Sequence, residues 1–170
     1  KLWWSEIRND ARWDLRQSSD IRFISFADPS RAHTLTKGRK YFNPTPSPDG
    51  KLLSVCEYAD AGQYFLRLLD SASGKVISSY PMPDGLQPLE SAWIGEELFI
   101  SALLDEGYGV FRIEGLSPDG KARLETVAKP CHSVISNLGI WPGTDRLTFV
   151  SDSSGASELY SLDTGDGTFT

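Results

Sequence analysis

The stretch Trp141–Gly167, with the sequence WPGTDRLTFVSDSSGASELYSLDTGDG, contains two short apolar strands separated by turns. The first strand carries Leu147 and Phe149, the second carries Leu159 and Leu162, and runs rich in Gly, Ser and Asp break the chain around them. A lone β-hairpin of this size is marginally stable in water, so one of its faces has to pack against another element. The stretch therefore predicts a protein built from several packed hairpins.

The rest of the chain repeats this pattern. The first apolar strand recurs at intervals of 50, 46 and 49 residues, as Lys1–Ser5 (KLWWS), Lys51–Val55 (KLLSV), Glu97–Ser101 (ELFIS) and Arg146–Val150 (RLTFV). An acidic residue closes the following strand at intervals of 44 and 49 residues, at Asp70, Glu114 and Asp163. Two landmarks with similar spacing indicate a repeat protein, and the unit has the length of a four-stranded β-propeller blade.

Two segments also resemble a known family. Ser47–Leu53 (SPDGKLL) and Trp141–Asp152 (WPGTDRLTFVSD) are similar to TolB-type, WD-like propeller repeats. The third repeat departs from this pattern, because Ile94–Glu97 (IGEE) stands where the Pro-Asp-Gly turn belongs. The resemblance covers nearly the whole chain and implies a fold rather than an activity.

The predicted fold class is all-β, with consecutive four-stranded blades of a β-propeller. About three and a half blades are expected, with approximate bounds 1–36 (incomplete), 41–80, 86–128 and 133–170 (incomplete). Because propellers usually close with about four to eight blades, we expect a segment of a larger ring; the alternative is that the two ends meet a partner. The start at Lys1, inside a strand pattern, indicates a piece of a longer protein. Asn9–Ser19 is the only stretch compatible with a helical turn.

Charge and composition exclude several classes of function. Lys and Arg number 17 and Asp and Glu number 23, and the net charge of −6 argues against a nucleic acid partner. No apolar window is long enough to insert into a membrane. Cys56, Cys131 and the two histidines lack the spacing of a zinc site, so we expect no cofactor. No GxSxG motif occurs and neither His33 nor His132 is patterned with a nucleophile, so we predict no catalytic residue.

A recognition surface is predicted where loops of one blade face gather. The long loop before Asp20, the connection before the second blade and the connection before the fourth blade should share that face. They contribute Arg12, Trp13, Arg16, Arg39, Lys40, Tyr41 and His132. Arg and Trp are enriched where binding energy concentrates, which favours a protein or peptide partner; a packed loop with Trp13 tucked onto its own blade is the alternative.

The innermost strands carry Asn43, Glu90 and Asn137 at equal intervals of 47 residues. Their oxygens could line the central channel and hold a metal, as in propeller lactonases, or they could simply be polar groups on a wet wall. Counted back from the strand ends at Ser47, Trp93 and Trp141, Glu90 lies three residues away, whereas Asn43 and Asn137 lie four residues away. Glu90 is therefore expected to point to the opposite face of its strand unless a bulge intervenes. Both tryptophans are expected to be buried wedges between blades.

The leading functional hypothesis rests on the resemblance together with the lack of a catalytic motif. It is a non-catalytic TolB-like module for protein or peptide interaction, which the resemblance places in the bacterial periplasm or at the cell surface. Its partner would be another protein or the remaining blades of the same chain. One alternative is the propeller domain of a larger hydrolase, as in prolyl-oligopeptidase-like peptidases, where the ring gates the active site. Another is a metal-dependent propeller lactonase.

Overall fold

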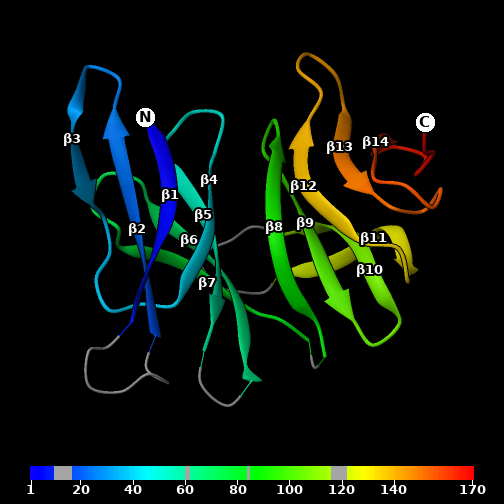
Figure 1. Cartoon of the computed structure of the whole chain (residues 1–170), viewed down its shortest axis with the longest axis horizontal. Helices are drawn as coiled ribbons and strands as arrows, with labels where there is room; N and C mark the ends of the chain where they lie inside the picture. The colour runs from blue at the N-terminus through cyan, green and yellow to red at the C-terminus, as the bar shows by residue number, and fades with distance from the viewer. Residues whose placement is uncertain (10–16, 60–61, 84, 116–121) are drawn as a thin grey trace. The chain divides into compact units, whose positions relative to one another are not determined.

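A computed structural model of the chain describes residues 1–9, 17–59, 62–83, 85–115 and 122–170. These residues form fourteen β-strands and no α-helix, arranged in four antiparallel sheets that follow one another along the chain (Figure 1). The predicted all-β class is therefore confirmed. Of the stretch with helical character, Asn9 ends a strand and residues 17–19 begin the next one, while residues 10–16 lie outside the described part.

Each sheet is made of consecutive strands in sequence order. The first sheet contains β1 (Leu2–Asn9), β2 (Gln17–Ser25) and β3 (Asp28–Thr34). The second contains β4 (Tyr41–Pro46), β5 (Leu52–Tyr58), β6 (Tyr64–Asp70) and β7 (Val76–Pro81). The third contains β8 (Gln87–Ile94), β9 (Glu97–Leu104), β10 (Gly107–Glu114) and β11 (Arg123–Cys131). The fourth contains β12 (Ile135–Ile140), β13 (Arg146–Ser151) and β14 (Glu158–Asp163).

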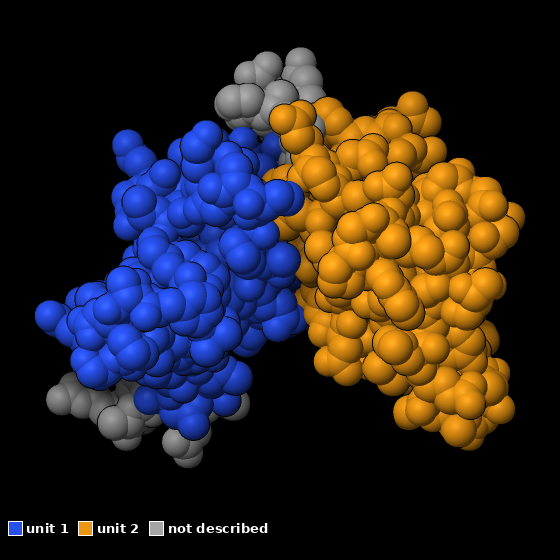
Figure 2. All heavy atoms as spheres, turned by 90° about the horizontal axis from the view of Figure 1, so that it is seen from above, with its two compact units in different colours: residues 1–81 blue, residues 82–170 orange. Residues whose placement is uncertain are grey.

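The chain divides into two compact units, Lys1–Pro81 with the first two sheets and Met82–Thr170 with the last two (Figure 2). Beyond β14, the backbone of Thr170 exchanges two hydrogen bonds with Ser161, of 2.8 and 2.9 Å. The fourth sheet therefore begins a further strand at its outer edge.

The strand registers place a leucine at the same position of every sheet. These leucines pair across the ladder with aliphatic residues, as Leu2 with Ile24, Leu53 with Leu69, Leu98 with Ile113 and Leu147 with Leu162. We call the side of the sheet that carries each pair its leucine face. The opposite side, the reverse face, carries Ile21, Leu66, Val110 and Leu159, each three residues before the partner of the leucine. Since side chains alternate along a strand, an offset of three residues puts them on the other side.

In the first unit, the reverse face of the first sheet packs on the leucine face of the second. Ile21 is buried in one cluster with Leu53, Val55 and Leu69. Burial of each such side chain contributes about 1.5–3 kcal/mol. The same joint is tied by a hydrogen bond of 3.0 Å from the backbone N–H of Asn43 to the hydroxyl of Ser5.

The second unit repeats this joint between its own two sheets, with β12 lying beside β8 (Figure 1). Phe99 and Val110, from the reverse face of the third sheet, are buried with Leu147, Phe149 and Leu162 from the leucine face of the fourth. The joint between sheets is therefore a repeated feature of the protein, built from the same two kinds of face in both units.

The expectation that Trp93 and Trp141 are equivalent buried wedges is wrong for Trp141. Trp93 pairs with Leu98, whereas the residue that pairs with Leu147 is Ile140. Trp141 is thus one position further on, and a one-residue offset turns a side chain to the other face. Trp93 is 6% exposed and Trp141 is 51% exposed.

Candidate interaction site

Leu159 is exposed at a position where the other three sheets bury their residue. It is 66% exposed, whereas its counterparts Ile21, Leu66 and Val110 are each 0% exposed. Trp141, which follows β12, is also half exposed. An uncovered apolar surface of this kind marks a place of contact, either with further sheets of a longer polypeptide or with another molecule, so the reverse face of the fourth sheet is the candidate site.

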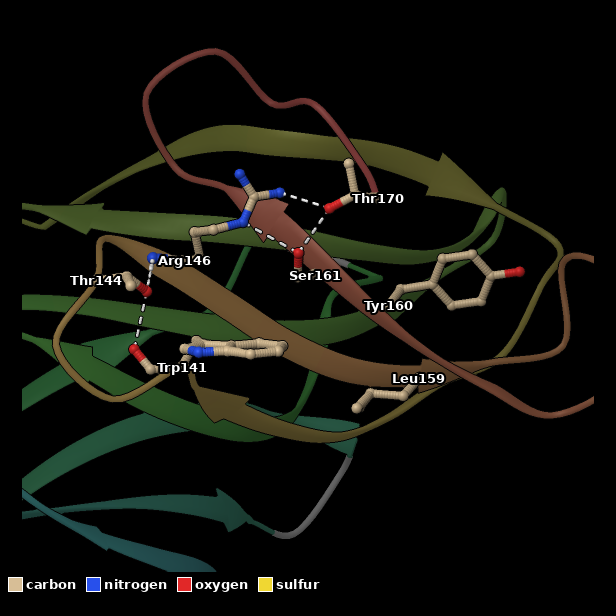
Figure 3. A pocket seen from close by; sticks show the side chains of 7 residues that line it. All are labelled: Trp141, Thr144, Arg146, Leu159, Tyr160, Ser161 and Thr170. Carbon is tan, nitrogen blue, oxygen red and sulfur yellow. Dashed lines mark hydrogen bonds between the residues drawn. The ribbon is translucent and has the colours of Figure 1, made fainter.

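A hollow of about 370 Å³ opens on this face (Figure 3). It is lined by Trp141, Thr144, Arg146, Leu159, Tyr160, Ser161 and Thr170. Figure 3 shows the polar side chains of Arg146, Ser161 and Thr170 gathered on one side of the Trp141 indole. The apolar side chain of Leu159 lies away from this group. The hollow therefore offers an apolar floor with hydrogen-bonding groups along one rim.

The turn after β12 sets the position of the indole. The Trp141 N–H donates to the Arg146 carbonyl at 2.9 Å, and the Trp141 carbonyl accepts from the Thr144 hydroxyl at 2.8 Å. Gly143 allows this turn with φ of 77°, a left-handed conformation that suits glycine. The sequence Pro142–Gly143 thus holds Trp141 beside the sheet instead of continuing the strand.

The guanidinium of Arg146 is held by three neighbours. Its Nε donates to the Ser161 hydroxyl at 3.0 Å and one terminal nitrogen donates to the Thr170 hydroxyl at 2.8 Å. The other terminal nitrogen lies 3.3 Å from a carboxylate oxygen of Asp163. An arginine fixed in this way beside an exposed tryptophan brings together two residue types that concentrate binding energy in interfaces.

A second, smaller hollow of about 240 Å³ lies in the same unit, next to the joint between the third and fourth sheets. It is lined by Ala128, Lys129, Cys131, Ile135, Phe149, Ser151, Ser153, Tyr160 and Phe169. The Phe149 ring stacks on Tyr160 at 6.0 Å between centroids and meets Phe169 edge-on at 5.9 Å. Ala128, Ile135 and Phe149 of this lining belong to the buried cluster of the unit, and Tyr160 packs partly buried against it.

The predicted recognition surface is only partly described. Arg12, Trp13 and Arg16 lie outside the described residues. Arg39 and His132 are exposed, and they belong to different units.

The connection before the second blade is tied to the first sheet. The backbone N–H of Arg39 donates to the Asp20 carboxylate at 3.3 Å, and its carbonyl accepts from Ser19 at 2.6 Å. Lys40 follows, half buried. Tyr41 is 2% exposed and lies in the core cluster of the first unit, so its side chain serves packing and is not available to a partner.

Burial raises the pKa of the Tyr41 phenol above its ordinary value, and the nearby Glu57 carboxylate raises it further. Both effects act in the same direction, because removal from water and a neighbouring negative charge each disfavour the phenolate. Glu57 itself is engaged by Arg67, whose Nε donates to it at 2.6 Å.

Asn43, Glu90 and Asn137 occupy matching places in the innermost strands, at irregularities of the β4–β5, β8–β9 and β12–β13 ladders. Asn43 and Asn137 have φ of 50° and 56°, the left-handed region that asparagine tolerates better than most residues. Glu90 accepts a hydrogen bond of 2.8 Å from the backbone N–H of Leu138, so its carboxylate ties the third sheet to the fourth. No group of three or more His, Cys, Asp or Glu side chains in the described part of the chain is arranged to hold a metal ion.

His33 and the cysteines occupy ordinary places. The His33 ring stacks on Phe23 at 5.0 Å between centroids, in the first sheet. Cys56 is buried and Cys131 is exposed, and the two cysteines do not form a disulfide bond. In the described ranges, no helix has the length and apolar character needed to cross a membrane.

Sequence reasoning missed Leu159 and Arg146 as members of a site. Both were placed correctly on strands, and the signal that could have found them is the third-strand aliphatic position that Leu159 shares with Ile21, Leu66 and Val110. Recognising that position requires the ladder register, which the repeat spacing alone does not provide.

Comparisons with known proteins identify the fold of the chain but assign it to no family. No protein-family model matches the chain, and no curated protein matches it. Solved structures do match. TolB from Acinetobacter baumannii superposes with a TM-score of 0.71 at 17% identity, over 99% of this chain and 40% of that chain. A TolB candidate from Agrobacterium tumefaciens gives a TM-score of 0.71 at 15% identity, over 99% of this chain and 61% of that chain.

The chain therefore has a TolB-like β-propeller fold, and it spans less than two thirds of either TolB chain. A dipeptidyl aminopeptidase IV candidate from Bacteroides ovatus also matches, with a TM-score of 0.59 at 15% identity, over 90% of this chain and 25% of that chain. At such identities the likeness concerns the fold, which is shared by proteins of different function.

Proposed function

We propose that this chain is a propeller module that binds a protein or peptide partner and does not itself catalyse a reaction. The observation that carries the proposal is the uncovered reverse face of the fourth sheet, where Leu159 and Trp141 are exposed beside a fixed arginine. The TolB resemblance supports a binding role, and in this proposal the protein acts in the bacterial periplasm or at the cell surface.

The geometry favours a partner with an apolar anchor. Trp141 and Leu159 present apolar surface, while Arg146, Ser161 and Thr170 form a hydrogen-bonded rim. A partner side chain that fills the hollow would be removed from water, and the rim groups would meet its backbone. This arrangement of an apolar centre with a polar margin is that of protein interfaces in general.

Panning a displayed random-peptide library on the immobilised chain tests the proposal. We expect enrichment of peptides with large apolar side chains, and we expect Trp141→Ala to weaken their binding by about tenfold or more, the size of a hot-spot loss. Phe26→Ala is the matched control, because Phe26 is 74% exposed in the β2–β3 turn of the other unit. Peptides that bind wild type and Trp141→Ala equally well would overturn the proposal.

A second candidate function is the propeller part of a larger peptidase, which the match to the Bacteroides ovatus protein favours, since this chain covers a quarter of that one. In that case the hollow would face other parts of the same enzyme. The complete reading frame decides between the two candidates, because a peptidase would show a catalytic segment such as GxSxG beside these repeats.

A further inference from the structure

We propose that the smaller hollow, next to the joint between the third and fourth sheets, binds a small organic carboxylate with an apolar body. The fourth sheet lines this hollow with Phe149, Ser151 and Tyr160. Phe149 lies two residues after Leu147 and Ser151 two residues further on, so both belong to the leucine face. A further sheet packed on the reverse face would therefore not fill the hollow, and the inference goes beyond the proposed function.

A bulge in β11 shapes the wall that the third sheet contributes. Val110 pairs with Ala128 and Tyr108 pairs with Cys131, so β11 has one more residue than β10 between these two pairs. In a regular strand, Ala128 and Cys131 would point to opposite sides because they are three residues apart. Here both line the hollow, together with Lys129. The extra residue thus turns Cys131 toward the hollow, and bulges often re-aim side chains in this way beside functional sites.

The body of the hollow is apolar and largely aromatic. Its walls include the stacked rings of Phe149 and Tyr160 and the edge-on ring of Phe169, with Ile135 beside them. Small-molecule sites usually have such a lining with a few polar groups. An apolar cavity of about 150 Å³ binds benzene, so the volume of about 240 Å³ suits a body of two fused rings.

The polar groups at the hollow favour an anion. Lys129 is exposed, and of the described residues that line the hollow it alone is charged. None of the ion pairs in the described part of the chain involves Lys129. Ser151 is 5% exposed, and its hydroxyl forms no hydrogen bond with another described residue. A ligand carboxylate can accept hydrogen bonds from both groups, since each is a donor.

Two probes with the same apolar body separate the contribution of the charge from that of the hollow. Isothermal titration calorimetry of the 170-residue chain with 2-naphthoate and with 2-naphthalenemethanol gives both dissociation constants. We expect 2-naphthoate to bind more tightly than the neutral alcohol. Lys129→Gln should weaken 2-naphthoate about fivefold, the size of one exposed charge pair, and leave the alcohol unchanged.

Arg123→Gln is the matched control for this substitution. It removes the same charge from an exposed position of the same strand, and Arg123 does not line the hollow. This variant should bind both probes like wild type, and circular dichroism checks that each variant keeps its fold.

Cys131 reports where the probe binds. It is exposed and lines the hollow, whereas Cys56 is 0% exposed, so iodoacetamide should alkylate Cys131 alone in the folded chain. We expect 2-naphthoate to slow this alkylation, measured by intact mass over time. The same protection is expected in Trp141→Ala, because Trp141 lines the other hollow.

Absence of 2-naphthoate binding, or equal affinity of wild type for the charged and the neutral probe, would overturn the proposal. Binding that leaves the alkylation rate of Cys131 unchanged would place the probe elsewhere and overturn it too. Equal losses in Lys129→Gln and Arg123→Gln would do the same, because they would reflect net charge. None of these results changes peptide binding that depends on Trp141, so the proposed function is tested separately.

Discussion

Gly107 lies where no side chain fits. Its φ is 114°, and a Cβ at this position would lie 2.0 Å from the carbonyl oxygen of Cys131 on the neighbouring strand β11. Since a backbone carbonyl in a sheet cannot move aside cheaply, we expect Gly107→Ala to lower the free energy of unfolding by more than about 2 kcal/mol.

Gly50→Ala is the control for this change, because Gly50 has φ of 70° and open space around its Cβ position. It should cost only the left-handed backbone strain of about 1–2 kcal/mol. Urea titrations of the two variants check the difference, and equal losses would show that the close approach to Cys131 contributes nothing.

Tyr41 is expected to make the free energy of unfolding depend on pH in the alkaline range. Burial and the Glu57 carboxylate raise its pKa in the folded state, so the folded protein holds this proton more tightly than the unfolded chain does. The stability that comes from the neutral phenol is fully present below the unfolded pKa and is lost as the pH rises through the folded pKa.

We therefore expect wild type to lose more unfolding free energy than Tyr41→Phe between about pH 9 and pH 11, the range where tyrosine titrates. Urea unfolding at a series of pH values measures both slopes. Parallel curves for the two proteins would contradict the assignment to Tyr41.

At the scale of the elements, the repeated leucine allows one residue type to be compared in two environments. Leu147 is 0% exposed in the joint of the second unit, and Leu2 is 58% exposed at the same register position. We expect Leu147→Ala to cost about 2–5 kcal/mol, the range for buried leucine, and Leu2→Ala about 0.5 kcal/mol or less. Denaturant unfolding at a protein concentration where the chain is monomeric gives both values, and similar losses would mean that the repeat does not equate the two positions.

The strands and the repeat were predictable from sequence, because apolar runs broken by turns are local signals. The register between neighbouring strands was harder to predict from sequence. Ile94 pairs with Glu97, which leaves a two-residue turn of Gly95 and Glu96 between β8 and β9, whereas the fourth sheet joins Ile140 to Leu147 by a longer loop. Aligning the two tryptophans concealed this difference in turn length, and the error of one residue placed Trp141 on the wrong face.

The same error affected the innermost strands. Counted from the ladder pairs instead of from the tryptophans, Glu90 falls in step with Asn43 and Asn137. The sequence interval of 47 residues was therefore the better guide to their equivalence. The hydrogen bond from Leu138 to Glu90 was not predictable, since it depends on how two sheets meet.

At the scale of the whole molecule, sequence shows that a face is apolar but not whether something covers it. Leu159 reads as an ordinary core residue beside Leu66 and Val110, and only the structure shows that it is open. The candidate site therefore could not be predicted from residue types, because it differs from the closed joints in burial and not in composition.

Because the sheets present the same two apolar surfaces, the apolar part of the joint needs no residues adapted to one place in the chain. Duplication of a gene segment that encodes one sheet would create a protein whose new junction already fits on both sides. Loss of such a segment would leave ends of the same kind as before. The number of sheets is thus open to change during evolution without redesign of the contacts between them.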